Sequence, residues 1–486
     1  MSRARPPEAA RAAAREGAGS SDRRARPPEA ARAAAREGAG SSDLRAQPPG
    51  PARAAACPGG GAPVPPFGTP SGGARACVAN GAAWVAWAAA VMLPALTLVM
   101  RGHTNAAYFF IALSTLAGAW ATRGAGRVDG PAFRADFGWL SLACAAPFIA
   151  VLWNQIVLGE FADRPYDAPA RLAFAGAAAW WLAQIPYGRL RHVQWGLCAG
   201  AMAGMLALLA ATHHDRPEPP FATAITFGNL SLLMGLCAWL ALGWRLSRMP
   251  RLEALLKVAA GFCGVYASFL SQSRGGWLAL PAVALMLLLL WRGHWRAKTI
   301  GALASLAFLG GIYLGSPMVQ QRVAQASTEL VDYLQGRHTD SSVGLRLQFW
   351  EASLEMFASR PMTGVGPQNV RAGFQARASA GELDAAAARF THSHNDVLWA
   401  MAGLGLPGLL ALFALYAVPL AIFVRVARRG APPQQAAACM GATVVVCFAV
   451  FGLTEAMFAI TMNAAFYAGM IAIFLALCKE SVPTRC

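Results

Sequence analysis

Three short polar segments interrupt the long apolar stretches of this chain, and each carries side chains able to do chemistry. Residues 271–277 read SQSRGGW, with Arg274 directly before two glycines. Farther along, Arg346 precedes Trp350 by four residues, a spacing that puts both on one face of a helix. Guanidinium groups hold phosphate oxygens through two parallel hydrogen bonds. Two such arginines therefore indicate a binding site for a diphosphate.

The third segment, THSHND, contains His392 and His394, followed by Asn395. A histidine titrates near neutral pH and therefore suits a general base that takes a proton from an attacking hydroxyl. Two histidines can also bind a metal, but no cysteine and no HExxH pattern accompanies them, so we predict no metal site. The alternative role of this segment is structural, because serine, asparagine and aspartate side chains cap helices.

Structural alternatives exist for the arginines as well. Arg274 would anchor a helix end if its side chain reached the membrane interface, and Arg346 would stack on Trp350 as an exposed loop residue. Against the first alternative, Gly275 leaves backbone N–H groups open to an anion. Glu455 lies in a short turn between two apolar blocks, where it would orient Arg274 or His394 unless it is simply an interfacial acid. The supporting residues of the predicted site are Ser273, Gly275, Trp350, His392, Asn395 and Glu455.

The composition excludes a water-soluble globular enzyme. Hydrophobic residues make up 56% of the 486 residues and charged residues 13%, whereas soluble domains contain about 45–50% and about 25%. The 41 Lys and Arg residues exceed the 24 Asp and Glu residues, for a net charge of +17. The arginines form no stripe on a soluble domain, so we expect no nucleic-acid partner. We predict a multi-span protein surrounded by membrane lipids.

Apolar blocks alternate with short polar hinges from residue 82 onward. Each block has about 18–22 residues, the length needed to cross a hydrocarbon core of roughly 30 Å. Such spans must be helical, because lipid cannot satisfy backbone hydrogen bonds. We therefore expect an all-α integral membrane protein with about twelve spans, centred near Ala90, Leu113, Pro147, Ala178, Gly204, Leu233, Cys263, Val283, Ala307, Phe413, Val445 and Ile471.

The predicted organisation has five parts. Residues 1–81 contain a 21-residue repeat, since residues 3–22 recur as residues 24–43. The repeat has no Leu, Ile, Val or aromatic residue to bury, so we expect a disordered basic tail on the cytoplasmic side. The remaining parts are nine spans in 82–315, a helical loop in 316–393, three spans in 394–478 and a cytoplasmic C-terminus in 479–486.

The one long connection is predicted to form a helical cap. Residues 342–360 carry apolar side chains at helical spacing, with Ser341 before them and Pro361 after them. A turn, TGVGPQN, and an alanine-rich helical stretch to Phe390 follow. Arginines gather in the hinges of the opposite side, which the positive-inside rule assigns to the cytoplasm. Both termini are then cytoplasmic, and the cap faces the periplasm.

Together these motifs resemble those of the lipopolysaccharide O-antigen ligases and their O-antigen polymerase relatives. The chain has SRGGW, then R-x3-W and P-x-TGVGP, then HN-x9-G-x2-G, in which His394 and Asn395 precede Gly405 and Gly408. The resemblance covers roughly residues 82–478 and includes the twelve-span layout with a long loop before the tenth span. It implies a GT-C-like fold. The motifs are degenerate singly, but their order and spacing make the resemblance specific.

The resemblance implies a glycosyltransferase in the bacterial inner membrane. Such an enzyme moves a glycan from undecaprenyl diphosphate to a sugar of the lipid A–core at the periplasmic face, inverting the anomeric centre without metal or cofactor. Transferred to this sequence, it makes His394 the base that activates the acceptor hydroxyl. Arg274 and Arg346 would hold the donor diphosphate and stabilise its departing charge.

Two alternatives stay open at this point. An O-antigen polymerase would use a second lipid-linked glycan as acceptor, but polymerases of this kind carry two sizeable periplasmic loops, and the last outer hinge here is short. A lipid or solute transporter would show internal repeats and polar breaks at mid-membrane. Asn154, Gln184 and Asn229 lie within predicted spans and favour transport, although hydrogen bonds between helices explain them equally well.

Overall fold

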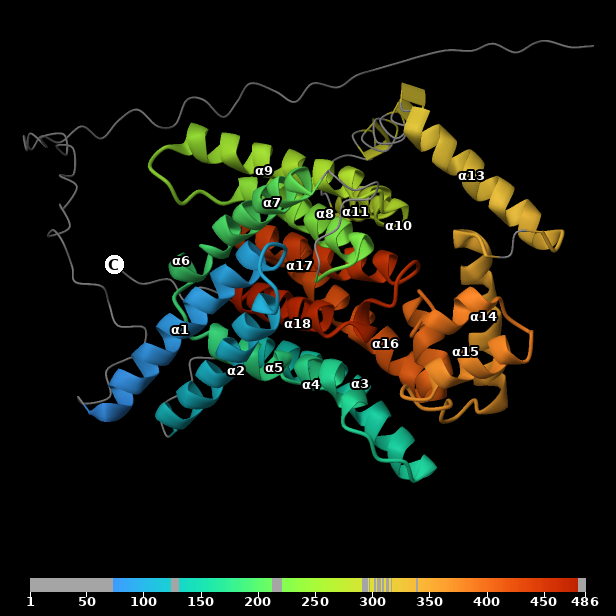
Figure 1. Ribbon diagram of the computed structural model, residues 1–486. Coiled ribbons are helices and arrows are strands. Elements are labelled where there is room, and N and C mark those ends of the chain that lie inside the picture. Colours follow the sequence, from blue (N-terminus) through green and yellow to red (C-terminus); the bar gives the residue numbers. More distant parts are fainter. Residues whose placement is uncertain are drawn as a thin grey trace, which may run out of the picture. The chain divides into compact units, whose positions relative to one another are not determined.

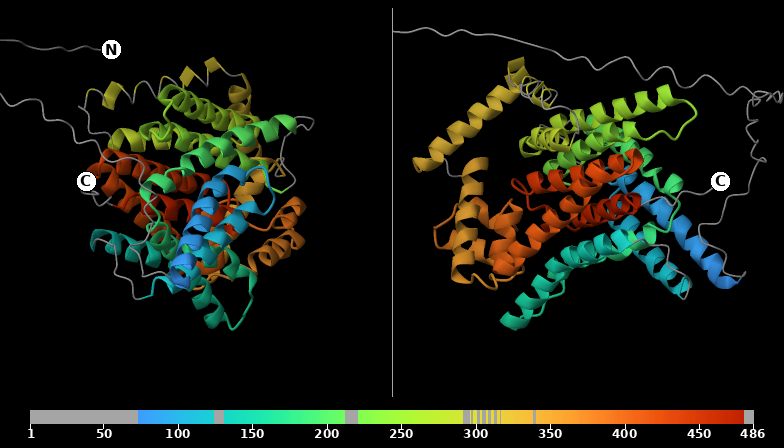
Figure 2. Two further views of the ribbon diagram at one scale, coloured as in Figure 1. Left: turned by 90° about the vertical axis from the view of Figure 1, so that its left-hand side faces the viewer. Right: turned by 180° about the vertical axis from the view of Figure 1, so that it is seen from behind.

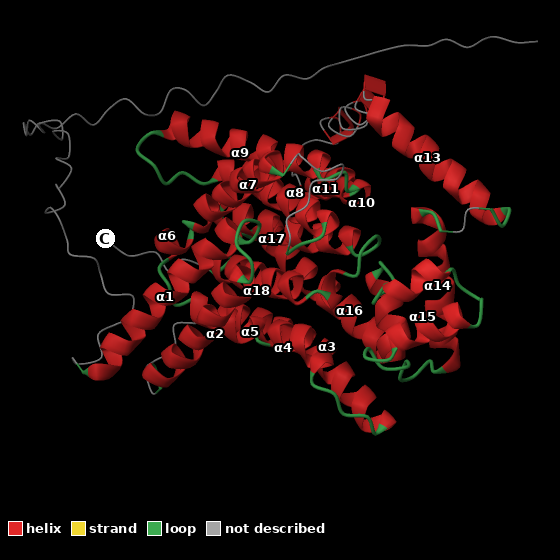
Figure 3. Cartoon of the chain, viewed as in Figure 1, coloured by secondary structure: helices red, strands yellow, loops and turns green. Residues whose placement is uncertain are grey.

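The computed structural model describes residues 73–123, 131–211, 221–290, 317–337 and 340–479, with scattered positions between 296 and 315. Nearly all of the predicted basic tail with its repeats lies outside these residues. The same holds for residues 480–486 and for most of the predicted ninth span near Ala307. Every regular element in the described part is a helix (Figure 3), as the predicted all-α class requires.

The described chain is a succession of helices joined by short turns (Figure 1). The elements are α1 (Ala74–Leu96), α2 (His103–Ala121), α3 (Pro131–Leu158), η1 (Arg164–Tyr166), α4 (Asp167–Ala173), α5 (Ala175–Leu182), α6 (Tyr187–Leu190), α7 (Val193–Ala210), α8 (Ala224–Leu240), η2 (Ala241–Gly243), α9 (Pro250–Leu270), α10 (Arg274–Trp277), α11 (Ala279–Leu290), α13 (Pro317–Leu334), α14 (Ser342–Ser359), α15 (Val370–Ser379), η3 (Ala385–Arg389), α16 (Asp396–Arg429), α17 (Pro432–Phe451), η4 (Met457–Ala459) and α18 (Thr461–Leu477). Helix α1 begins inside the stretch predicted as tail, which therefore ends earlier than residue 81.

Seven helical stretches of the described residues are long and apolar enough to cross a membrane. They lie in α1, α3, α6 with α7, α8 with η2, α9, α16 and α17, whereas the apolar helices around α11 and α18 are shorter. The predicted number of twelve spans is thus not confirmed. The stretch near Ala178 shows one reason. Helices α4 and α5 are separated at Phe174, and the chain turns before Pro186, which cannot continue a helix.

The centre of the bundle is formed by helices that are buried on all sides. Every residue of α18 from Asn463 to Leu477 is buried, and α18 contacts α17, α5, α4 and α2. Helix α8 is buried in the same way over most of its length. A helix that is apolar all round belongs in a protein interior. Outer helices such as α2 and α3 instead expose large apolar side chains, as a lipid-facing surface requires; Figure 2 shows the bundle from two further sides.

The long connection before α16 folds into a small helical unit, which we call the cap (α14, α15 and η3). Its apolar core includes Phe349, Met356 and Phe374 and continues onto α16. As predicted, Ser341 begins α14: its hydroxyl oxygen accepts a hydrogen bond of 3.0 Å from the backbone N–H of Gly344. Helix α13 precedes the cap and contacts α14. This helix was not predicted from the sequence, because its exposed apolar residues form no long apolar block.

A kink in α16 explains the glycine pattern of the third motif. Gly405 has φ 65° and interrupts the helical backbone. The turn TGVGP packs onto this kink, since the N–H groups of Val365 and Gly366 donate to the carbonyls of Ala402 (2.8 Å) and Gly403 (3.0 Å). A Cβ atom on Gly405 would lie only 2.6 Å from the carbonyl oxygen of Pro361. This glycine is therefore required by the close approach of cap and membrane helix.

Candidate active site

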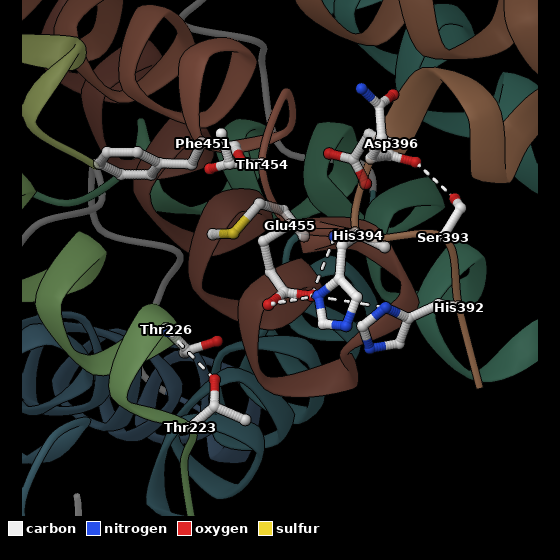
Figure 4. A network of polar contacts seen from close by, with 12 residues as sticks. Thr223, Thr226, His392, Ser393, His394, Asp396, Phe451, Thr454 and Glu455 are labelled. Carbon is white, nitrogen blue, oxygen red and sulfur yellow. Dashed lines mark hydrogen bonds and ion pairs between the residues drawn. The ribbon is translucent and has the colours of Figure 1, made fainter. Parts of the chain in front are cut away.

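The histidine predicted as the base, His394, lies against Glu455 although 61 residues separate them in the chain (Figure 4). Its Nδ1 atom is 3.2 Å from each oxygen of the Glu455 carboxylate. The Nδ1 atom of His392 is 3.4 Å from Oε1 of the same carboxylate, and the two imidazole rings lie 4.6 Å apart between centroids. Glu455 is only 1% exposed. The structure thus gathers two imidazoles around one buried carboxylate.

Asn395 fastens the histidine segment to the turn that carries Glu455. Its side-chain oxygen accepts hydrogen bonds from the backbone N–H groups of Val397 (2.9 Å) and Leu398 (3.1 Å), which caps the start of α16. Its amide nitrogen donates to the carbonyl of Leu453 at 3.1 Å. The helix-capping role considered for this segment therefore applies to Asn395. The neighbouring His394 instead contacts Glu455.

Asp396 makes a second connection to the same turn. Its backbone N–H donates to the carbonyl of Gly452 at 2.7 Å, and its carboxylate accepts from the backbone N–H of Phe458 (3.1 Å) and the hydroxyl of Tyr416 (2.9 Å). A Cβ atom on Gly452 would lie 2.5 Å from this carboxylate. These bonds hold both ends of the turn, so the position of Glu455 relative to His394 is set by the start of α16.

Two non-glycine residues in the described part of the chain have positive φ, and both adjoin the predicted motifs. His394 has φ 50°, and Gln272, in the SQSRGGW segment, has φ 56°. This left-handed region is sparsely populated by residues other than glycine. Such backbone strain costs about 1–3 kcal/mol and is found mainly where the surrounding structure serves a function. The two strained positions therefore mark the same region as the sequence motifs.

The electrostatics of this group favour a charged carboxylate. Burial by itself would raise the pKa of Glu455, but the hydrogen bond and charge of His394 and the charge of His392 lower it below the ordinary value. Burial lowers the pKa of His392, against the opposing effect of Glu455, and the charge of His394 lowers it further. These shifts favour the ionised form of Glu455 and the neutral form of His392. Aromatic rings of Phe349 and Phe390 lie close to His394.

A cavity of about 510 Å³ adjoins the turn that carries Glu455. Residues of three predicted regions line it: Ser273 and Gly275 from the SQSRGGW segment, Arg346 from α14, and Thr454, the neighbour of Glu455. His394 itself is not among the lining residues. Glu329 from α13 also lines the cavity. Its carboxylate oxygens accept hydrogen bonds from the backbone N–H of Val343 and the side-chain amide of Gln325. The structure thus brings Arg346 and the SQSRGGW segment to one cavity.

The glycines of the SQSRGGW segment have a packing role that the sequence analysis did not predict. A Cβ atom on Gly275 would lie 2.1 Å from the hydroxyl oxygen of Thr454, and one on Gly276 would lie 2.3 Å from the side-chain oxygen of Asn229. Arg274 is the first residue of α10, and its side chain lies outside the described residues. The close packing of Gly275 against Thr454 therefore places this segment next to the turn that carries Glu455, independently of the position of the Arg274 side chain.

Arg346 and Trp350 are four residues apart on α14 and have different recorded neighbours. Arg346 is half-buried and lines the cavity, whereas Trp350 packs against the apolar core of the cap. The indole Nε1 atom of Trp350 is buried without a hydrogen-bond partner among the described residues. The residues that sequence reasoning missed, Gln272 and Thr454, are uncharged and lie next to the predicted motifs. Adjacency to those motifs was the only signal for them.

The histidine–glutamate group also has the composition of a metal site, which the sequence analysis predicted to be absent. One potential ligand atom from each of His392, His394 and Glu455 lies within 4.8 Å of the other two. The sequence offered only the two histidines of THSHND as ligands, which is too few for a metal site. The third side chain comes from a turn far along the chain, and the spacing within THSHND gives no indication of it.

Comparison with known proteins identifies the segment that contains these motifs. Residues 258–413, just under a third of the chain, match the family model described as O-antigen ligase. This segment of the chain is similar to the O-antigen ligase family. The predicted resemblance is thereby confirmed. A second comparison finds a protein of Haemophilus influenzae (strain ATCC 51907 / DSM 11121 / KW20 / Rd), described only as an uncharacterized protein. It is 23% identical over 277 residues, which cover 56% of this chain and 69% of that protein.

The segment that matches the O-antigen ligase model runs from α9 to the kinked part of α16. It therefore includes the SQSRGGW segment, the cap and the histidine segment, but it ends before Glu455. Members of this family are ligases or polymerase-like glycosyltransferases, and several apolar helices mark this chain as a multi-pass membrane protein. Glu455 is thus a residue outside the family match that the fold adds to the site.

Proposed function

We propose that the protein is an O-antigen ligase that transfers a glycan from undecaprenyl diphosphate to a sugar hydroxyl of lipid A–core. The observation that carries this proposal is the contact of His394 with buried Glu455, next to a cavity lined by Arg346 and the SQSRGGW segment, in a chain with a segment similar to the O-antigen ligase family. The reaction would occur at the periplasmic face of the bacterial inner membrane. The cap would then face the periplasm, and both termini the cytoplasm.

His394 is proposed as the general base. A carboxylate only accepts hydrogen bonds, so the Nδ1 atom that faces Glu455 carries the proton and Nε2 keeps its lone pair. The acceptor hydroxyl gives its proton to Nε2 while its oxygen attacks the anomeric carbon of the donor sugar. The bond from that carbon to the diphosphate breaks, and undecaprenyl diphosphate leaves with the electron pair. Attack from the opposite face inverts the anomeric centre, and Glu455 stabilises the imidazolium that forms.

The arginines are proposed to neutralise the leaving group without a metal or other cofactor. Arg346 lines the cavity, and the backbone of Arg274 lies between the lining residues Ser273 and Gly275. A guanidinium binds diphosphate oxygens bidentately and keeps its charge at every physiological pH. Its charge offsets the charge that develops on the departing diphosphate, which lowers the barrier to transfer.

A ligase is favoured over a polymerase by the connection between the last two helices. Helix α17 ends at Phe451 and α18 begins at Thr461, and this short turn is filled by η4 and by the residues that hold Glu455. A second sizeable outer loop, as polymerases of this kind carry, has no room there. The acceptor is therefore proposed to be lipid A–core and not a second lipid-linked glycan.

The test is transfer by the purified protein in vitro with undecaprenyl-diphosphate glycan as donor. With lipid A–core as acceptor we expect one glycan per acceptor, unchanged in EDTA, and no product when the donor is offered alone. His394→Ala should abolish transfer while thermal unfolding stays close to that of the unaltered protein. His103→Ala, a histidine on α2, is the matched control and should retain activity. Glycan-length extension with donor alone would identify a polymerase, and full activity of His394→Ala would refute the mechanism.

A further inference from the structure

The proposed transfer uses the contact between His394 and Glu455 but assigns no role to His392, which faces the same carboxylate. We propose that these three side chains bind one divalent cation of the zinc type through Nδ1 of each histidine and Oε1 of the glutamate. Oε1 is 3.2 Å from Nδ1 of His394 and 3.4 Å from Nδ1 of His392. One potential ligand atom from each residue lies within 4.8 Å of the other two. Figure 4 shows both rings turned toward the carboxylate.

The two histidine–carboxylate distances are close to those of a tetrahedral zinc site. Ligand atoms at about 2.0–2.1 Å from the metal and at tetrahedral angles lie roughly 3.3 Å from one another. The two histidine–carboxylate distances agree with this value, and small side-chain rotations would bring all three ligand atoms, which lie within 4.8 Å of one another, onto one ion. Two neutral imidazoles and one carboxylate are a common zinc ligand set, and a water molecule would complete four-coordination. Nδ1 of His392 is buried and makes no hydrogen bond among the described residues, so this nitrogen can serve as a ligand.

The surroundings also suit a bound cation. Oε1 of Glu455 accepts a hydrogen bond of 3.1 Å from the backbone N–H of Ala456, which holds the carboxylate in its orientation. Aromatic rings of Phe349, Phe390 and Trp399 lie near the two imidazoles and limit the access of water. The charge of the single carboxylate reduces the net charge of a bound divalent ion to +1. This partly offsets the free-energy cost of removing the ion from water.

Occupancy of this site would inhibit glycan transfer, a consequence that rests on the proposed function. A metal on Nδ1 of His394 leaves the single proton of the neutral ring on Nε2. The nitrogen that should accept the proton of the attacking hydroxyl then becomes a donor. The metal also takes the carboxylate of Glu455 away from the imidazole. Zinc therefore converts the base into a form that cannot act, whereas EDTA leaves catalysis intact.

Binding is tested on the purified full-length protein in detergent, titrated with Co²⁺ and then with Zn²⁺. Tetrahedral Co²⁺ absorbs in the visible range, and a thiolate ligand would add a charge-transfer band, so sites at cysteines are recognised. We expect one Co²⁺ per chain without that band, displaced by one equivalent of Zn²⁺. His392→Ala should weaken binding by at least about tenfold, because even second-shell changes cost that much. His103→Ala should bind as the unaltered protein does.

The outcomes separate this inference from the proposed function. Equal Co²⁺ binding by the unaltered protein and His392→Ala would overturn the metal site, as would the absence of stoichiometric binding. Glu455→Gln, which keeps the size of the side chain, gives a second variant should His392→Ala fail to fold. In the transfer assay, zinc should inhibit and EDTA should restore the rate. Stoichiometric binding with an unchanged transfer rate would keep the site and refute both the inhibition and the role of His394 as base.

Discussion

Replacing Glu455 by glutamine tests whether its negative charge assists His394. Glutamine keeps the shape of the side chain and still offers one oxygen to Nδ1, whereas the charge is lost and the second oxygen becomes an NH2 group. Hydrogen bonds to charged groups contribute about 1.5–3 kcal/mol and neutral ones about 0.5–1.5 kcal/mol. The contact is buried and both oxygens lie 3.2 Å from Nδ1, so we take a difference of about 1.4 kcal/mol. This corresponds to about a tenfold decrease in kcat.

The loss should appear in kcat and not in the KM for the donor. The imidazolium exists only once the acceptor proton has moved, so the carboxylate stabilises the transition state more than the bound substrates. The assay measures initial rates over a range of donor concentrations with lipid A–core in excess and EDTA present, which removes any bound metal. Glu355→Gln on α14, an exposed acid paired with Arg377, is the matched control and should leave both constants unchanged.

A more severe variant sharpens the same test. Glu455→Ala removes the acceptor for the Nδ1 proton, so the ring is free to adopt the tautomer whose Nε2 carries the proton. We expect this variant to lose more activity than Glu455→Gln, with a similar temperature of thermal unfolding. If Glu455→Gln kept the full kcat, the charge of this carboxylate would play no part in transfer. If both variants were fully active, the contact with His394 would be structural only.

Three other substitutions test the cavity, the packing and the membrane core. Arg346→Lys should lower transfer at least about tenfold, because a point charge loses the bidentate grip on a diphosphate; the donor KM and rate measure this, and full activity would contradict diphosphate binding. Gly275→Ala should lower the stability by about 1–3 kcal/mol through overpacking against Thr454, and Thr454→Gly in the same chain should restore the unfolding temperature. Lys257→Met leaves the buried carboxylate of Glu253 unpaired and should cost about 3–5 kcal/mol, whereas replacing both by apolar residues should recover most of this loss.

Local features of the fold could be predicted because they depend on neighbouring residues. Ser341 and Pro361 delimit α14 through capping and through the missing N–H of proline, and the structure ends the helix between them. The apolar blocks predicted helices wherever the structure describes them. The structure differs from the expectations where local signals are weak. The fourth predicted span is broken at Phe174, and the amphipathic α13 was overlooked because it has no long apolar block.

For the candidate site, the sequence by itself supplied the residue types and their order. It singled out His394, Arg346 and the SQSRGGW segment because arginines and histidines at the ends of apolar blocks carry an energetic cost that function can explain. Only the tertiary structure decided which of them meet. Glu455 reaches His394 across 61 residues because hydrogen bonds of Asp396 and Asn395 fix the α17–α18 turn to the start of α16. Periodicity and capping act within a few residues, whereas such contacts depend on how whole helices pack.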